Sequence, residues 1–200
     1  MKTIIITGPS GSGKTYISKK LSKSLDNAII IKTDSYYRDD LFIKILSFFI
    51  YDIYDRIISI KRNEIKKTII SIYNKEKKIT FYNYDFKRKR SSKITKKIKS
   101  KASTKYIIVE GIFAHRLGLN YKETINCICN DKKKVCYERR LKRDQLQRGR
   151  EKAEVSKKFI KSWNLFFKNL NKYIISNKLI TLNSDHKKSY DKLLITILKI

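Results

Sequence analysis

The sequence has a single proline and six glycines, so it contains no collagen-like repeat and no linker-like stretch. Its three cysteines, Cys127, Cys129 and Cys136, form no Cys-x-x-Cys pair, which argues against a disulfide framework or a zinc site and for buried thiols in a reducing compartment. No apolar run approaches the roughly 18 residues of a membrane span, and the N-terminal run is too short for a signal peptide. We therefore expect a cytoplasmic protein with no membrane partner.

Positive charge is abundant instead. The chain has 48 lysines and arginines against 18 acidic residues, and its formal net charge is +30. Such an excess fits a polyanion partner, namely nucleotide phosphates, nucleic acid or an anionic membrane. It also fits a compositional bias in which lysines cover solvated faces, and their spread along the chain favours this second interpretation. The 200 residues, 41% of them hydrophobic, suit one domain over residues 1–200.

Short β-branched segments alternate with longer helical patterns. The segments typical of buried parallel strands are residues 2–7, 28–33, 106–110, 124–129 and 179–182. Helices are expected over residues 15–25, 41–50, 64–73, 132–147, 155–175 and from 186 to the end. Residues 79–84 fit a further short strand, and the basic stretch 87–101 is expected to be a mobile loop. The alternation predicts an α/β fold with a mainly parallel five-stranded sheet flanked by helices, which binds ligands at the carboxyl ends of its strands.

A glycine-rich turn follows the first strand. It reads Gly8-Pro9-Ser10-Gly11-Ser12-Gly13-Lys14-Thr15 and fits the P-loop pattern Gly-x4-Gly-Lys-[Ser/Thr]. Glycines let backbone N–H groups wrap phosphate oxygens, and the helix that follows adds its positive N-terminal end. Lys14 would bridge the β- and γ-phosphates of ATP, and Thr15 would offer its hydroxyl to Mg²⁺. The sequence therefore predicts a P-loop NTPase fold that binds ATP.

Two acidic residues follow apolar strands of the same expected sheet. Glu110 ends the strand 106–110, and beside a P-loop it is expected to be the second Mg²⁺ ligand, directly or through water. Asp34 follows the second strand and would face the γ-phosphate, where a carboxylate can accept the proton of an attacking hydroxyl. The alternative role for Asp34 is that of a helix N-cap.

A basic helix is expected to form a lid over residues 132–155. Arg140 and Arg143 are three positions apart and share one face of that helix. Gly149 can end the helix and turn Arg148 back toward the cleft. Phosphoryl transfer needs cations around the transferred group, which a closing lid can supply. The alternative is a solvated basic helix with no role in binding.

These features occur in an order that resembles the uridine kinase family, with phosphoribulokinase as a relative. The resemblance covers residues 8–150 and rests on the P-loop and four further blocks: Asp34-Ser35-Tyr36-Tyr37-Arg38, Tyr84-Asp85-Phe86, Val109-Glu110-Gly111-Ile112-Phe113-Ala114, and Arg139-Arg140-Leu141-Lys142-Arg143-Asp144 with Arg148-Gly149-Arg150.

The resemblance implies a role for each matching side chain. It makes Asp34 the catalytic base on a 5′-hydroxyl, with Lys14 and Arg143 as the other catalytic groups. It places Tyr37 in the substrate pocket and Tyr84 against the nucleoside base. It assigns Glu110 to the magnesium site, and Arg140, Arg143 and Arg148 to the grip on substrate or nucleotide phosphates.

The nucleoside-reading positions depart from the family pattern. Lys89 stands where uridine kinases have a histidine that helps recognise the pyrimidine, and lysine donates hydrogen bonds but cannot accept them. The acidic segment that holds the ribose has its nearest counterpart in residues 51–56, without the His-Pro pair, so that Asp52 becomes the candidate for the ribose. Lys158 stands near the position of an expected glutamine.

The leading interpretation is a uridine kinase-like enzyme that transfers the γ-phosphate of ATP to a hydroxyl of a uridine- or cytidine-type nucleoside, with Mg²⁺ as cofactor. One alternative is a kinase for another small alcohol or sugar phosphate, similar to phosphoribulokinase or pantothenate kinase. Others are a nucleic-acid-binding ATPase and a P-loop protein that binds nucleotide without transfer. We do not expect nucleic acid as a partner, and a homo-oligomer remains open.

Overall fold

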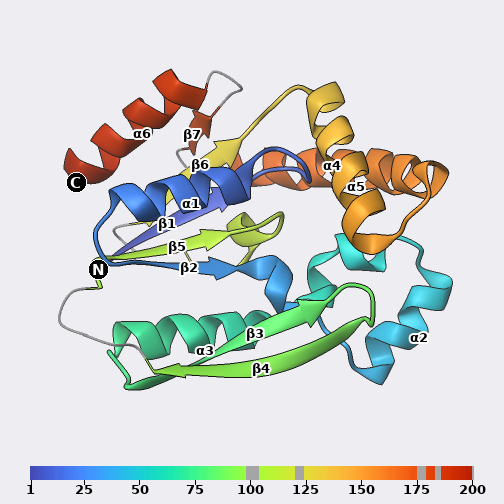
Figure 1. Cartoon of the computed structure of the whole chain (residues 1–200), viewed down its shortest axis with the longest axis horizontal. Coiled ribbons are helices and arrows are strands. Elements are labelled where there is room, and N and C mark those ends of the chain that lie inside the picture. Colours follow the sequence, from blue (N-terminus) through green and yellow to red (C-terminus); the bar gives the residue numbers. More distant parts are fainter. Residues whose placement is uncertain (98–103, 120–123, 175–178, 183–185, 200) are drawn as a thin grey trace.

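The computed structural model describes residues 1–97, 104–119, 124–174, 179–182 and 186–199. Its centre is a sheet of five parallel strands in the order β2-β5-β1-β6-β7 (Figure 1). The strands are β1 (Lys2–Thr7), β2 (Ala28–Lys32), β5 (Tyr106–Glu110), β6 (Thr124–Cys129) and β7 (Leu179–Leu182). The α/β fold and the five parallel strands expected from the sequence are confirmed, and the expected strand bounds differ only at residue 33.

Helices cover both faces of this sheet. The helices of the chain are α1 (Lys14–Ser24), α2 (Leu41–Phe49), α3 (Arg62–Tyr73), α4 (Lys133–Arg148), α5 (Lys152–Ile174) and α6 (His186–Lys199), with short 3₁₀ turns η1 (Thr33–Tyr36), η2 (Ile53–Asp55), η3 (Ile57–Ser59) and η4 (Ala114–Arg116). Figure 1 shows α1 and α6 on one face and α3 on the other. None of the helices, within the described residues, is long and apolar enough to cross a membrane.

Strand β1 explains why both faces must be covered. Its isoleucines alternate, so that Ile4 and Ile6 pack in one core with α1 and α6, whereas Ile5 packs in the other with α3. Consecutive side chains of a strand point to opposite faces, and an apolar run therefore needs a layer on each side. Register pairs Ile6 and Lys32 with Glu110, which brings the carboxyl ends of β1, β2 and β5 to one edge.

The basic stretch 87–101 was expected to be a mobile loop, and this prediction is wrong for residues 90–97, whereas residues 87–89 form a turn. Residues Arg90–Lys97 form strand β4, which pairs antiparallel with β3 (Lys78–Asp85). The turn between them is closed by the Asp85 carboxylate, which accepts hydrogen bonds from the backbone N–H groups of Lys87 (2.8 Å) and Arg88 (3.0 Å). Residues 98–101 lie outside the described residues. The sequence does not indicate this strand, because nearly all of β4 is solvent-exposed and its residues show no apolar alternation.

Candidate active site

The P-loop links β1 to α1 and needs its glycines for close packing. Gly11 and Gly13 have φ angles of +89° and +85°, a region that side-chain-bearing residues rarely adopt. A Cβ atom on Gly11 would lie 2.1 Å from the carbonyl oxygen of Cys136 in α4. The loop is therefore fixed both by its own backbone and by contact with the basic helix.

Lys14 opens α1 and turns back over the loop. Its Nζ donates a hydrogen bond of 2.8 Å to the carbonyl oxygen of Pro9. Burial lowers the pKa of Lys14, while the nearby carboxylates of Asp34 and Glu110 act in the opposite sense. A buried ammonium group beside a glycine-rich loop at a helix N-terminus is suited to binding a polyphosphate.

Two carboxylates and a hydroxyl lie beside the P-loop. Thr15 Oγ1 donates to Glu110 Oε1 over 3.0 Å, and burial, followed by the charge of Asp34, raises the pKa of Glu110. Asp34 Oδ1 is buried and has no hydrogen-bond partner among the described residues. Oxygen donors of this kind suit Mg²⁺, which usually takes one or two carboxylates together with substrate phosphates. Thr15 and Glu110 therefore fit a magnesium ion bound together with ATP.

Gly111 explains why Asp34 and Glu110 come so close together. A Cβ atom at Gly111 would lie 1.8 Å from Thr33 Oγ1, and its φ of +152° is one that L side chains rarely adopt. Since Thr33 precedes Asp34 and Gly111 follows Glu110, this close approach brings the ends of β2 and β5 together. Both acids line a cleft of about 860 Å³ that also contains Lys14 and Thr15.

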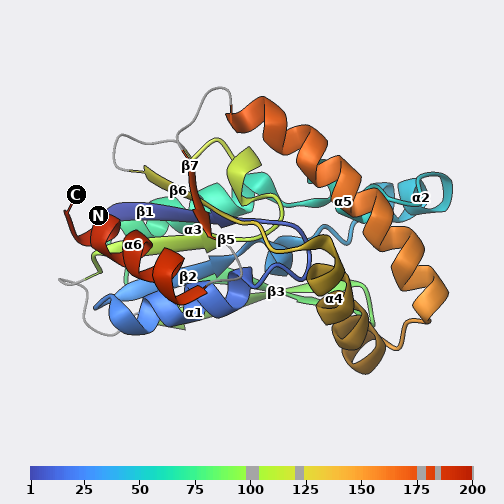
Figure 2. The same cartoon turned by 90° about the horizontal axis from the view of Figure 1, so that it is seen from above.

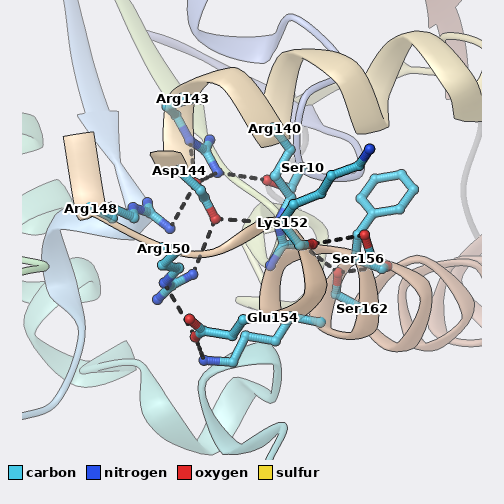
Figure 3. A network of polar contacts seen from close by, with 12 residues as sticks. Ser10, Arg140, Arg143, Asp144, Arg148, Arg150, Lys152, Glu154, Ser156 and Ser162 are labelled. Atoms are coloured by element: carbon cyan, nitrogen blue, oxygen red, sulfur yellow. Dashed lines mark hydrogen bonds and ion pairs between the residues drawn. The ribbon is translucent and has the colours of Figure 1, made fainter. Parts of the chain in front are cut away.

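A single buried carboxylate organises the basic lid (Figure 3). Asp144 has no exposed surface, and its oxygens lie 2.9 Å from Arg143, 3.1 Å from Arg150, 3.4 Å from Arg148 and 3.6 Å from Arg140. Burial alone would raise the pKa of Asp144, but the arginine charges outweigh it and the pKa lies below its ordinary value. One anion thus orients four guanidinium groups and leaves most of their positive charge for a ligand.

The lid arginines also contact the P-loop and the neighbouring helix α5. Arg143 donates to Ser10 Oγ in the P-loop over 3.0 Å, and Arg140 donates to Ser162 Oγ of α5 over 2.6 Å. The guanidinium of Arg148 stacks on the Phe86 ring at 3.9 Å. Burial, and then Arg143, lowers the pKa of Arg148 to about 10, so that the group stays protonated at neutral pH. The helix ends at Gly149 with a φ of +63°, as expected from the sequence.

A smaller pocket of about 80 Å³ opens beside the cleft and shares Tyr37, Asp55, Phe86, Arg140 and Arg148 with it. Its aromatic wall is made of Tyr37, Tyr84 and Phe86, whose ring centroids lie 5.1 to 5.8 Å apart. Burial raises the pKa of Tyr37 well above its ordinary value, and Asp34 adds to this shift. We call this space the acceptor pocket, because it shares five lining residues with the cleft that contains Asp34 and has none of the P-loop residues in its own lining.

Comparison with known proteins shows to which family the chain belongs. A sequence model of the phosphoribulokinase/uridine kinase family matches residues 3–180. The chain belongs to this family of small-molecule kinases. No curated protein matches the chain in a sequence search.

Solved structures show the same fold at low sequence identity. The structure of the YGR205w protein has a TM-score of 0.65 and 15% identity, with 92% of this chain and 86% of that chain covered. A possible uridine kinase from Bacillus stearothermophilus has a TM-score of 0.50 and 14% identity, with 89% and 87% covered. These likenesses confirm a P-loop kinase fold.

The structure brings most of the expected family residues together. Of the expected nucleotide-binding residues, Ser10, Gly11, Gly13, Lys14, Thr15, Arg140 and Arg148 line the cleft, whereas Gly8, Pro9 and Ser12 do not. Tyr37, Tyr84 and Lys89 line the acceptor pocket. Asp52 lies in neither lining, because its carboxylate is turned to Arg56 at 3.1 Å. Asp55, three residues later at the end of η2, lines both spaces instead, and burial raises its pKa while Arg140 opposes the shift.

Several side chains of the site were not predicted, and three of them, Asp55, Phe86 and Arg139, bear on its chemistry. Asp55 lies in the acidic stretch 51–56 that the sequence singled out, but nothing in that stretch indicated which acid faces inward. Phe86 closes the Tyr84-Asp85-Phe86 block, and Arg139 opens the arginine block, so both had a signal in the family pattern. Arg139 lines the cleft and donates to the Gly11 carbonyl oxygen over 3.4 Å.

Proposed function

We propose that this protein transfers the γ-phosphate of ATP to a hydroxyl group of a small acceptor, and that a nucleoside of the uridine or cytidine type is the first candidate for that acceptor. One observation carries the proposal: Asp34 lines the cleft that joins the P-loop to an aromatic pocket, and its buried carboxylate oxygen Oδ1 has no hydrogen-bond partner among the described residues. An unpaired buried acceptor atom is costly to maintain, and a substrate hydroxyl would satisfy it.

The residues of the cleft divide the chemistry between them. The P-loop N–H groups and Lys14 hold the ATP phosphates, and Asp34 accepts the proton as the acceptor oxygen bonds to the γ-phosphorus and ADP leaves. Arg143 and Arg148 neutralise the charge on the transferred group. Mg²⁺, held by Thr15 and Glu110, supplies further neutralisation of the phosphate oxygens when bound. The lid excludes water so that ATP is not simply hydrolysed.

The aromatic rings of the acceptor pocket support a nucleoside. Tyr37, Tyr84 and Phe86 offer flat apolar surfaces on which a base can stack. Asp55 is the only acid of the pocket lining and can accept hydrogen bonds from ribose hydroxyls.

A second candidate acceptor, a phosphorylated sugar or alcohol, is supported by a different observation. Five of the pocket-lining side chains are cationic, including Lys89, Arg150 and Lys158, against the single carboxylate of Asp55. Part of this charge is already neutralised, because Arg150 contacts Asp144 and Lys158 contacts Glu154. Lys89 keeps its charge available at the mouth of the pocket.

An ADP-release assay with purified protein, ATP and Mg²⁺ tests the proposal against a panel of nucleosides and phosphorylated sugars. We expect ADP release to depend on one acceptor class. Asp34→Asn should bind ATP normally and lose about 10²- to 10⁴-fold in turnover. The matched control is Asp26→Asn, an exposed acid at the opposite end of β2, which should retain full turnover. Near-normal turnover of Asp34→Asn, or no acceptor-dependent ADP release, would refute the proposed reaction.

A further inference from the structure

Helix α2 lies at one end of the molecule (Figure 2), and it exposes an unusual amount of apolar surface. Ile43 is its only buried residue. Six of the 14 large apolar side chains that are exposed among the described residues fall within residues 41–51; we call them the α2 patch, namely Leu41, Phe42, Ile45, Phe48, Phe49 and Tyr51. The exposed fractions of Phe48 and Phe49 are 86% and 81%. Single exposed apolar residues are common, but a contiguous group indicates a binding surface.

The helix is well formed despite this exposure. The Asp40 side chain caps its first turn by accepting a hydrogen bond from the backbone N–H of Ile43 over 3.2 Å, and the backbone N–H of Ile50 closes the last turn on Leu46. The cap and a single buried side chain therefore hold α2 in place, and no described element covers its outer face. Helix α2 therefore exposes these apolar side chains to solvent in a fixed arrangement.

The surroundings of the α2 patch are basic. Lys157 and Lys161 are exposed on α5, and their Nζ atoms lie 5.3 Å and 5.2 Å from the centre of the Tyr51 ring, while Lys44 is exposed on α2 itself. Of the nearby acids, Asp40 pairs with Arg38, Asp52 with Arg56 and Glu154 with Lys158, whereas Asp55 is partly buried and forms no ion pair among the described residues. The exposed charge around the α2 patch that is not neutralised by an ion pair is therefore positive.

This charge selects between the partners that an apolar surface could have. A second copy of the chain would bring another net charge of +30 against the first, which opposes association. An anionic lipid surface offers apolar depth for the rings and negative charge for the lysines. A membrane partner was not expected from the sequence because only spanning segments have a clear sequence signal, whereas surface binding depends on which side chains are exposed.

We propose that the α2 patch docks the protein on an anionic membrane surface. The side chains of Phe48 and Phe49 enter the boundary between headgroups and acyl chains, and Lys44, Lys157 and Lys161 face the lipid phosphates. Tyr51 belongs both to the patch and to the lining of the acceptor pocket. Docking therefore places the mouth of that pocket close to the membrane surface.

Co-sedimentation of the full-length chain with vesicles tests this docking. The vesicles are made either of phosphatidylcholine alone or of phosphatidylcholine mixed with phosphatidylserine. We expect binding to the mixed vesicles, and a loss of at least about tenfold in affinity for the double variant Phe48→Ser/Phe49→Ser, because two exposed rings lose their apolar contact. The control Ile195→Ser/Leu198→Ser removes two exposed apolar side chains from α6 and should bind as the wild type does.

Three outcomes would overturn the proposal. If the α2 variant and the wild type bind mixed vesicles equally well, the overall charge of the protein accounts for binding and the patch does not. If the wild type fails to bind, there is no docking surface. If sedimentation equilibrium shows an oligomer that the α2 variant converts to a monomer, the patch is a self-association surface. ATP binding by both variants shows that they are folded, and it is measured independently of any acceptor.

Discussion

The two sides of the cleft are built from different interactions. The phosphate side, residues 8–15 with α4, is held by charged hydrogen bonds: Asp144 orients four arginines and Arg143 reaches Ser10 over 3.0 Å. The acceptor side, residues 37–60 and 84–90, is held by ring contacts of 5.1 to 5.8 Å between Tyr37, Tyr84 and Phe86 and by short 3₁₀ turns. Charged hydrogen bonds are directional and therefore allow only one arrangement of their donors and acceptors. Packed rings, in contrast, can be replaced by other apolar side chains of similar volume at a small cost in stability.

This difference has a consequence for substitutions. Changes on the phosphate side should remove turnover whatever the acceptor is. Changes on the acceptor side should alter the acceptor that is used and leave ATP binding intact. The comparison fails if a substitution on one side produces the effect expected for the other.

The largest effect is expected for Lys14→Met. Methionine keeps the length of the side chain but cannot neutralise phosphate oxygens, and Lys14 is the ammonium group folded over the loop at 2.8 Å from the Pro9 carbonyl. Turnover should fall about 10³-fold with every acceptor in the ADP-release assay. The control Lys19→Met replaces an exposed lysine of the same helix and should remain active. A loss confined to one acceptor would show that Lys14 does not serve the phosphate side.

A smaller loss is expected for Arg143→Ala. The neighbouring Arg139, Arg140 and Arg148 remain in the cleft and continue to neutralise charge, so turnover should fall about 10²-fold rather than vanish. The effect should appear in kcat and not in the acceptor KM. Lys142→Ala removes an exposed cation one position away in α4 and should change neither constant. Equal effects of the two variants would mean that the lid acts only through its total charge.

The phosphate side was predictable from the sequence because backbone constraints define it. Gly11 and Gly149 have positive φ angles, and Lys14 and Thr15 follow the loop at fixed positions. The spacing of these residues in the sequence is therefore sufficient to predict how they lie in the P-loop. The family pattern indicated Arg143 and Arg148 as lid residues, whereas Asp144 entered it only as the last residue of the block 139–144, with no sign that it is buried among the arginines.

The acceptor side was predictable only in part, since its geometry depends on tertiary packing. Tyr37 and Tyr84 were expected in one pocket and meet there at 5.3 Å. The inward acid is Asp55 rather than Asp52, and this is decided by the 3₁₀ turn η2 and by the pairing of Asp52 with Arg56. Strand β4 is not predictable from the sequence pattern because its register with β3 is set by the turn at Asp85 rather than by apolar alternation.

Asp55→Asn should therefore act on the acceptor alone. Asp55 lines the acceptor pocket, and the loss of a charged hydrogen-bond acceptor should raise the acceptor KM roughly tenfold or more. The KM for ATP should stay the same. Asp52→Asn is the matched control, because its carboxylate already pairs with Arg56 outside both spaces. If Asp52→Asn raises the acceptor KM and Asp55→Asn does not, the ribose-binding role belongs to Asp52.

The smallest effect, expected for Lys89→Gln, distinguishes the two candidate acceptors. Lys89 lies at the exposed mouth of the pocket with a φ of +51°, where glutamine keeps the length of the side chain and removes the charge. The KM for a phosphorylated acceptor should rise roughly two- to fivefold, since an exposed ion pair contributes little. The KM for a neutral nucleoside should not change, and added salt should reduce the difference. Lys93→Gln removes an exposed charge from β4 outside the pocket and serves as the control. An equal change in KM for both acceptors would show that Lys89 stabilises the hairpin turn and does not bind the charged group of the acceptor.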